Sequence, residues 1–260
     1  MPVSRSLPSV KTDGTSSARE HAQTINELRR AVLDIQDRLA WVAPPELPEG
    51  SKTGYPVLLG GNADTSAAAT TGTVTPTANA LVFVALAARA TASLSGVSTV
   101  TDSLPTPLAW QKIRGATYDD GSGDRLLLDI YAARAGSAPI DMIIAGSVTG
   151  AAALIVAAIE IACDTAADLA NTAADSEPDG SIQLALDSAP DDISTVIAFD
   201  CTLGAYSVRP PLGFTNAGEM VARGMTVGVA FKSQKVDQSF SWRASGMRAT
   251  AVACEIKAPA

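Results

Sequence analysis

From residue 80 to the C-terminus, short runs of apolar residues alternate with clusters of turn-forming residues. Ala80–Ala88 and Ala151–Ala162 are continuous apolar runs, typical of strands buried on both faces, and Leu108–Arg114 alternates apolar and polar positions. The Val, Ile and Thr content of the runs favours strands over helices. We therefore predict about ten antiparallel strands in an all-β sandwich or jelly roll of two sheets, beginning near residue 73.

A helical pattern precedes this region. Ser17 and Glu20 have the spacing of a capping box, and neither Gly nor Pro follows until Pro44, so we expect a helix over residues 18–43. Its apolar residues recur at alternating steps of three and four, which are the a and d positions of a heptad. This spacing predicts a short coiled coil that joins copies of the chain and leans toward trimers. The heptad positions are Ile25, Leu28, Val32, Ile35, Leu39 and Val42.

The alternative is an amphipathic helix that packs on its own domain, with Leu33 and Trp41 widening the apolar stripe. Residues 1–17 are rich in Ser, Pro and Thr, and we expect a flexible anchor that becomes ordered against a partner. The Pro and Gly residues of 44–72 predict an extended linker. The β domain then fills residues 73–260.

Composition and charge narrow the possible partners. The formal net charge is −8, and nucleic acids and anionic membrane surfaces attract basic proteins, so we expect neither as a partner. The N-terminus has no apolar segment typical of a secretory signal. Cys163, Cys201 and Cys254 are too few and too widely spaced for a disulfide framework or a zinc site. We expect buried thiols in a protein that assembles in a reducing cytoplasm.

Catalytic chemistry has little support in the sequence, and we predict that the protein is not an enzyme. His21, the single His, lies in the predicted helix, which excludes a Ser-His-Asp or Cys-His pair from the β domain. Glu160 and Glu255 are the Glu residues embedded in strong strands, and we expect both to face solvent. The similar segments around them are either equivalent strands of two half-units or a coincidence in an Ala-rich chain.

An acidic loop at residues 119–124 is the best candidate for a ligand or metal site. Its Asp, Ser and Gly residues suit a polar hairpin loop, and they also offer oxygen ligands for calcium, although the distal Glu of an EF-hand is missing. We expect no cofactor, with calcium as the alternative. Exposed aromatic residues near such a loop stack on sugars. The candidate ligand-binding residues are Tyr118, Asp119, Asp120, Asp124 and Tyr206.

A series of β segments follows in order along residues 73–258, namely Val74–Thr77, Leu81–Val84, Ser98–Leu104, Leu108–Trp110, Leu127–Ala133, Ile155–Glu160, Pro211–Thr215 and Ala251–Ile256. In this order the segments resemble the jelly-roll or lectin-like sandwich modules of tailed-phage minor tail, fibre and head-spike proteins. The combination of a Ser/Pro tail, a coil and a β head is likewise similar to phage fibres.

The resemblance implies a virion protein, assembled in the host cytoplasm, whose N-terminus docks on other virion proteins. It implies attachment of the β domain to neighbouring virion proteins or to a host cell-surface glycan. It transfers no catalytic or sugar-binding residue to this chain. The alternatives are a carbohydrate-active enzyme, or a glycan-binding adhesin, on a concanavalin-like sandwich.

Overall fold

The computed structural model describes residues 53–91, 94, 97–119, 121, 123–163, 167–178, 181–204, 209–243 and 248–257. Within these residues the protein is all-β, with antiparallel strands, as predicted. None of them belongs to a helix long and apolar enough to cross a bilayer. The strands are β1 (Thr53–Asp64), β2 (Ala68–Val74), β3 (Leu81–Ala90), β4 (Ser98–Asp102), β5 (Gln111–Asp119), β6 (Arg125–Arg134), β7 (Met142–Val148), β8 (Ala153–Cys163), β9 (Asp168–Glu177), β10 (Ser181–Ala185), β11 (Thr195–Leu203), β12 (Thr215–Ala222), β13 (Met225–Ser233), β14 (Ser239–Arg243) and β15 (Ala249–Lys257).

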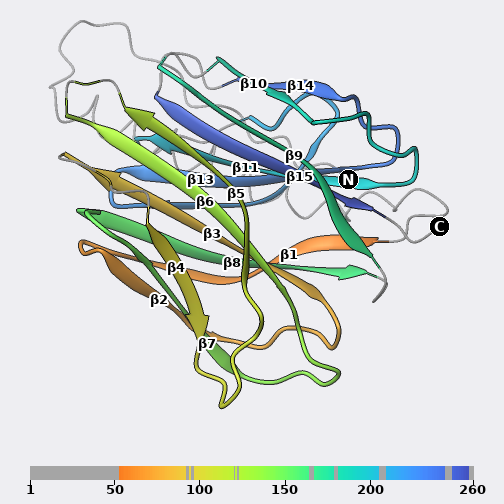
Figure 1. Cartoon of the computed structure of the whole chain (residues 1–260), viewed down its shortest axis with the longest axis horizontal. Helices are drawn as coiled ribbons and strands as arrows, with labels where there is room; N and C mark the ends of the chain where they lie inside the picture. The colour runs from red at the N-terminus through yellow and green to blue at the C-terminus, as the bar shows by residue number, and fades with distance from the viewer. Residues whose placement is uncertain are drawn as a thin grey trace, which may run out of the picture. The chain divides into compact units, whose positions relative to one another are not determined.

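The strands form four stacked sheets (Figure 1). Inner sheet 1 has the order β1-β8-β3-β6-β5, and inner sheet 2 has the order β12-β13-β11-β15-β9. The two inner sheets pack face to face over one large apolar core. Outer sheet 1, with the order β2-β7-β4, covers the other face of inner sheet 1, and outer sheet 2, the pair β10-β14, covers the other face of inner sheet 2. The described residues thus contain four sheets where the sequence predicted two.

Burial on both faces explains the continuous apolar runs. In β3, Phe83 and Ala85 point into the core between the inner sheets, whereas Val82 and Val84 point toward outer sheet 1. Neither face of the strand meets water, so the usual alternation of apolar and polar residues is missing. The rings of Phe83 and Phe199 meet across the central core with centroids 5.8 Å apart. Ala, Ile, Leu and Val make up most of the remaining core residues, as the low aromatic content requires.

The strand order is the same in residues 53–163, here called repeat 1, and in residues 168–257, repeat 2. In inner sheet 1 the first strand of the repeat lies beside its last strand, and β3, β6 and β5 follow. In inner sheet 2 the first strand, β9, lies beside the last, β15, and β11, β13 and β12 follow. The outer pairs β2–β7 and β10–β14 also correspond. The one strand of repeat 1 without a described counterpart is β4.

Backbone hydrogen bonds repeat at equivalent positions. Ahead of β3, the N–H of Ala80 donates to the carbonyl of Thr77 at 3.1 Å, and ahead of β11 the N–H of Ser194 donates to Asp191 at 3.0 Å. Bulges also recur, because β5 gains one residue between Lys112 and Arg114, and β12 gains one between Asn216 and Gly218. Agreement at this level shows that the two repeats are structurally equivalent, not merely similar in strand count.

The two repeats face each other with twofold character. The edge strand β1 lies near β12, and the edge strand β5 lies near β9. Exchanging the repeats turns the first of these contacts into the second. The central core therefore resembles the interface of a symmetric dimer, with both halves carried by one chain.

One expectation from the sequence differs from this architecture, and a second concerns residues that the structure does not describe. The segment 44–72, expected to be a linker, contains β1 and most of β2. β1 carries Pro56 and three glycines, and it tolerates them because it is an edge strand that pairs with β8 alone. The predicted helix over 18–43 and its heptad positions lie outside the described residues.

Candidate functional site

The acidic loop between β5 and β6 uses its described carboxylates for structure. Tyr118, expected at the surface, is 7% exposed and belongs to the central core. Asp119 pairs with the guanidinium of Arg125 at 2.6 Å and accepts the N–H of Gly121 at 3.0 Å. Asp120 and Tyr206 lie outside the described residues. The five candidate residues are therefore not shown to form one ligand site.

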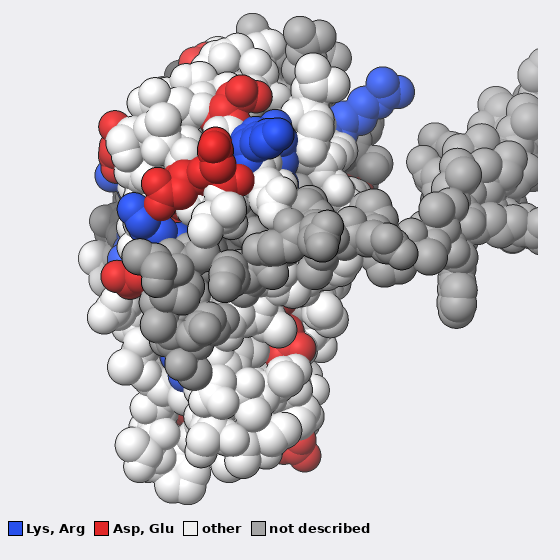
Figure 2. All heavy atoms as spheres, turned by 90° about the vertical axis from the view of Figure 1, so that its right-hand side faces the viewer, with Lys and Arg blue, Asp and Glu red and all other residues white. Residues whose placement is uncertain are grey.

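Asp124 joins the two repeats. One carboxylate oxygen lies 3.1 Å from Nη2 of Arg89 in repeat 1, and the other lies 2.7 Å from Nη1 of Arg248 in repeat 2. Guanidinium groups therefore already engage the carboxylates of both Asp119 and Asp124. Across the described residues, no group of three or more His, Cys, Asp or Glu side chains is placed to hold a metal ion. Figure 2 shows basic and acidic side chains close together on the upper part of one face, above a largely uncharged region.

Glu160 and Glu255 hold equivalent loops in the two repeats. Glu160 accepts hydrogen bonds from the backbone N–H of Thr77 at 2.7 Å and from its hydroxyl at 2.8 Å. Glu255 accepts the backbone N–H of Asp191 at 3.1 Å and a short hydrogen bond from the side-chain amide of Asn171. Each carboxylate thereby fastens the turn that leads into the central strand of its repeat.

These contacts correct the prediction that both Glu side chains face solvent, since Glu255 is 1% exposed and Glu160 is half-buried. Opposite each Glu lies a valine, Val82 or Val196, that points toward the outer sheet of its own repeat. The two carboxylates are consequently separated by both inner sheets, which pack about 10 Å apart. They cannot act together on one glycosidic bond, for which the separation is at most about 9.5 Å.

Each repeat also buries an Asp side chain between its inner and outer sheets. In repeat 1, Asp129 accepts hydrogen bonds from Nζ of Lys112 at 2.6 Å and from the hydroxyl of Ser98 at 2.5 Å. In repeat 2, Asp200 is fully buried, and among the described residues no side chain donates a hydrogen bond to it. Both carboxylates lie over a glycine on the neighbouring strand, Gly115 for Asp129 and Gly228 for Asp200.

The environment of Asp200 favours its neutral form. Burial raises the pKa of this carboxyl well above its ordinary value, and the nearby charge of Glu219 raises it further. Backbone N–H groups of Gly228 and Asp200 act in the opposite direction but are weaker. The indole of Trp242 packs close to the same glycine from outer sheet 2. The sequence did not single out Asp200, because a lone Asp in an apolar strand gives no sign of its partners.

The cysteines agree with the predicted buried thiols in two of three cases. Cys201 and Cys254 are free and fully buried, and Cys163 is free and partly buried. Burial raises the pKa of the Cys254 thiol to about 12 and raises the pKa of Cys201 further. Both thiols stay protonated at neutral pH and are poor nucleophiles.

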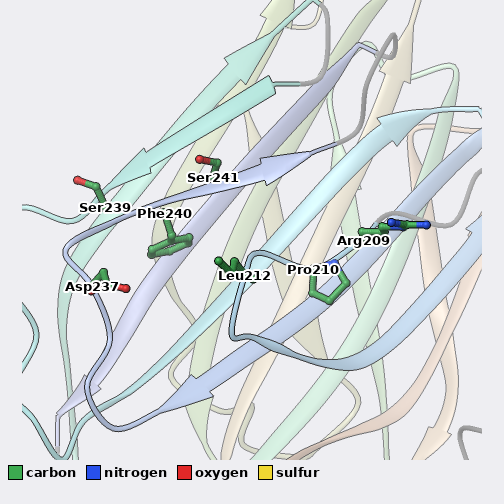
Figure 3. Close-up of a pocket in the computed structure, with 7 residues that line it drawn as sticks. All are labelled: Arg209, Pro210, Leu212, Asp237, Ser239, Phe240 and Ser241. Atoms are coloured by element: carbon green, nitrogen blue, oxygen red, sulfur yellow. The ribbon is translucent and has the colours of Figure 1, made fainter.

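A pocket of about 480 Å³ opens beside β14 in repeat 2. Figure 3 shows the side chain of Phe240 on β14 and that of Leu212, on the segment before β12, on either side of it. Phe214 packs on Phe240 with ring centroids 4.7 Å apart, and Leu212 is 97% exposed. The pocket-lining residues are Arg209, Pro210, Leu212, Asp237, Ser239, Phe240 and Ser241. The pocket combines an apolar floor with hydroxyl and charged groups at its rim, which is the general character of a binding site.

The comparisons with known proteins find no match among protein-family models, curated proteins or solved structures.

Proposed function

We propose that this protein is a structural component of a tailed-phage virion, a minor tail, fibre or capsid-surface protein that presents its β domain for attachment. The observation that carries the proposal is the nested pairing of strands in each repeat. In repeat 1 the first strand pairs with the eighth, the second with the seventh and the third with the sixth. The seven described strands of repeat 2 are nested likewise, with β9 beside β15, β10 beside β14 and β11 beside β13. A long hairpin rolled up in this manner is a jelly roll, a fold common in viral capsid and lectin domains.

The chemistry of the described residues supports a scaffold in preference to an enzyme. Glu160 and Glu255 fasten loops on opposite outer faces, and Asp124 joins the repeats through two arginines. Carboxylates engaged in this way have structural tasks, and the paired-carboxylate arrangement of a glycosidase has no candidate among them. Fold alone does not decide function, so the structural role of these carboxylates rests on their contacts and not on the jelly roll.

Self-association is the second part of the proposal. Residues 18–43 form a coiled coil through Ile25, Leu28, Val32, Ile35, Leu39 and Val42, and the copies form a trimer. Residues 1–17 anchor the assembly on neighbouring virion proteins. A seam of this length is weak in isolation, so we expect it to work together with contacts of the anchor or the β domain.

A host cell-surface glycan is the second candidate role, as the target of attachment. The pocket beside β14 favours it, because an aromatic floor with hydroxyl and charged groups at its rim suits a sugar. Binding of a glycan array by the wild-type protein, weakened several-fold by Phe240→Ala, would support this role. Equal binding by both proteins would remove the pocket as the glycan site.

The experiment that tests the assembly is light scattering after size exclusion on the full chain. We expect the mass of three chains for the wild type, and the mass of one chain for a Leu28→Asp/Ile35→Asp variant, because charges at a and d positions oppose the seam. The matched control is Arg29→Asp/Asp34→Arg, which changes charges outside the seam and should remain trimeric. A wild-type monomer would contradict the coiled coil.

A further inference from the structure

The pocket beside β14 carries its charged lining residues at opposite ends. In Figure 3, Asp237 lies at one end of the row of labelled residues and Arg209 lies at the other. Phe240, Leu212 and Pro210 lie between them and supply the apolar surface. A ligand that spans the pocket therefore meets a carboxylate at one end, an apolar middle and a guanidinium at the other end.

A lysine offsets the charge of the acidic end. Nζ of Lys232 lies 3.6 Å from the carboxylate of Asp237. The stem of Lys232 crosses Gly213, where an added Cβ would lie 3.7 Å from Cε of the lysine. The side chain of Asp237 is 83% exposed, and a carboxylate has lone pairs for more than one donor. Asp237 can therefore accept a hydroxyl group from a ligand while it keeps its contact with the lysine.

The basic end has no such offset. Arg209 is exposed, and among the ion pairs of the described residues none involves its guanidinium. The described charged groups at the pocket are thus two cations, Arg209 and Lys232, and one anion, Asp237, which together give a net charge of +1. The whole chain carries −8. A positive net charge at a pocket of an acidic chain favours a ligand with an anionic group.

The lining also narrows the kind of anion. One guanidinium matches one carboxylate, because its N–H groups and the two carboxylate oxygens form parallel hydrogen bonds. Phosphate groups are characteristic ligands of helix N-termini and glycine-rich loops, and the described lining contains neither. Ser239 and Ser241 add hydroxyl groups, which match the hydroxyls of a sugar ring. The volume of about 480 Å³ lies within the range of small-ligand sites.

We propose that the pocket beside β14 binds an acidic sugar of a host glycan, with the sugar carboxylate on Arg209. This inference rests on the proposed glycan-binding role and names the class of glycan. The sugar hydroxyls bond to Asp237, Ser239 and Ser241, and the apolar face of the sugar ring packs on Leu212. Each lining group thereby has a partner of its own chemical kind, and the carboxylate distinguishes this ligand from neutral glycans.

A glycan array probed with the full chain tests the inference. The array carries acidic glycans, each beside its carboxyl methyl ester, which keeps the sugar but removes the charge. We expect the wild type to bind the acids several-fold more strongly than the esters. Arg209→Gln should weaken binding of the acids about tenfold and leave the esters unchanged, because an ester offers no carboxylate to the guanidinium. The matched control is Arg223→Gln, which removes an exposed arginine between β12 and β13 and should keep the preference for acids.

Two further measurements separate charge from geometry. Arg209→Lys keeps the charge but loses the forked pair of N–H groups, so its preference for acids should lie between those of the wild type and Arg209→Gln. Raising the salt concentration from about 0.05 M to about 0.5 M should weaken acid binding by the wild type and leave ester binding unchanged. Thermal unfolding checks that each variant is folded, which we expect because Arg209 is exposed.

Equal binding of acids and esters by the wild type would overturn the inference, and so would unchanged acid binding by Arg209→Gln. If Phe240→Ala weakens binding of both forms in that case, the pocket still binds a glycan and only the acidic class is wrong. No binding of any glycan by the wild type would remove the glycan role together with this inference. The mass from light scattering decides the trimer separately, so the proposed assembly does not depend on either outcome.

Discussion

Repeat 1 and repeat 2 share a strand order, a bulge and a loop-fastening Glu, but they differ in the described strands of their outer sheets and in the partners of a buried Asp. Repeat 1 has a three-stranded outer sheet, and its buried Asp129 has a Lys and a Ser as partners. In the part of repeat 2 that the structure describes, the outer sheet has two strands, and the buried Asp200 receives no hydrogen bond from a described side chain. The comparison teaches that the shared strand order, bulge and Glu contacts carry the fold, whereas the partners of the buried Asp differ between the repeats.

The largest expected effect tests whether the repeats contribute equally to the central core. Phe83→Ala and Phe199→Ala each remove a fully buried ring from opposite sides of the same core. Each should lower the free energy of unfolding by about 3–5 kcal/mol, measured by urea titration. The exposed Val221→Ala should change it little. A large loss from one substitution and a negligible loss from the other would contradict a shared core.

The next comparison concerns the carboxylates that fasten equivalent loops. Glu160→Gln and Glu255→Gln keep the size of the side chain but weaken its hydrogen bonds to backbone N–H groups. We expect losses of about 1–3 kcal/mol in unfolding free energy, larger for the fully buried Glu255. Urea titration measures both, with the half-buried Glu177→Gln as a control in an adjoining strand of repeat 2. Unchanged stability in both variants would remove the shared structural role.

Asp129→Asn and Asp200→Asn should act in opposite directions at neutral pH. Asp129→Asn weakens the contact with Lys112 and should cost about 1–3 kcal/mol. Asp200→Asn replaces a carboxyl whose pKa burial raises, so it should stabilise the protein. Because the pKa is raised in the folded protein, wild-type Asp200 does not lower the free energy of unfolding at pH values below its ordinary pKa of about 3.9. It lowers that free energy increasingly as the pH rises toward its folded pKa.

The stabilisation by Asp200→Asn should therefore grow as the pH is raised from 4 toward neutrality, as measured by thermal unfolding of both proteins across that range. A pH-independent difference would show that Asp200 does not carry the inferred pKa shift. Destabilisation by Asp200→Asn at neutral pH would mean that the charged carboxylate has a partner in the folded protein.

The smallest expected effect compares an ion pair within repeat 1 with a carboxylate that joins the two repeats. The partly exposed pair of Asp119 and Arg125 should contribute about 0.2–1 kcal/mol, lost in Asp119→Asn. Asp124→Asn affects two arginines, one from each repeat, and should cost more than Asp119→Asn. Chemical unfolding in low salt, repeated in high salt, checks both values. Equal losses would argue against a special role for Asp124 between the repeats.

Much of the fold follows from local pattern. The run around Phe83 predicted a strand buried on both faces, and the structure confirms it. The four sheets could not be foreseen, because a run buried on both faces does not reveal whether its neighbours are two layers or four. β1 was missed for a physical reason, since Pro56 and its glycines weaken a strand signal and are tolerated only at an edge.

The candidate site was less predictable. The similar segments around Glu160 and Glu255 fitted either two half-units or a coincidence in an Ala-rich chain, and their matching strand positions and backbone contacts show the former. The prediction for Tyr118 was wrong because the residue beside the acidic loop is also a strand position, and in β5 its side chain points into the core. The pocket beside β14 is lined by two segments that lie far apart in the sequence, around Arg209 and around Phe240, so no local pattern indicates it.

Residue-resolved amide hydrogen exchange on the full chain tests the duplication most directly. The equivalent pairs are Thr77 with Asp191, Ala80 with Ser194, and Ala135 with Gln234, whose N–H groups make matching hydrogen bonds in the two repeats. We expect every one of these amides to be protected, with similar protection within each pair. Protection in repeat 1 together with exchange at open-chain rates in repeat 2, or the reverse, would contradict two equivalent repeats.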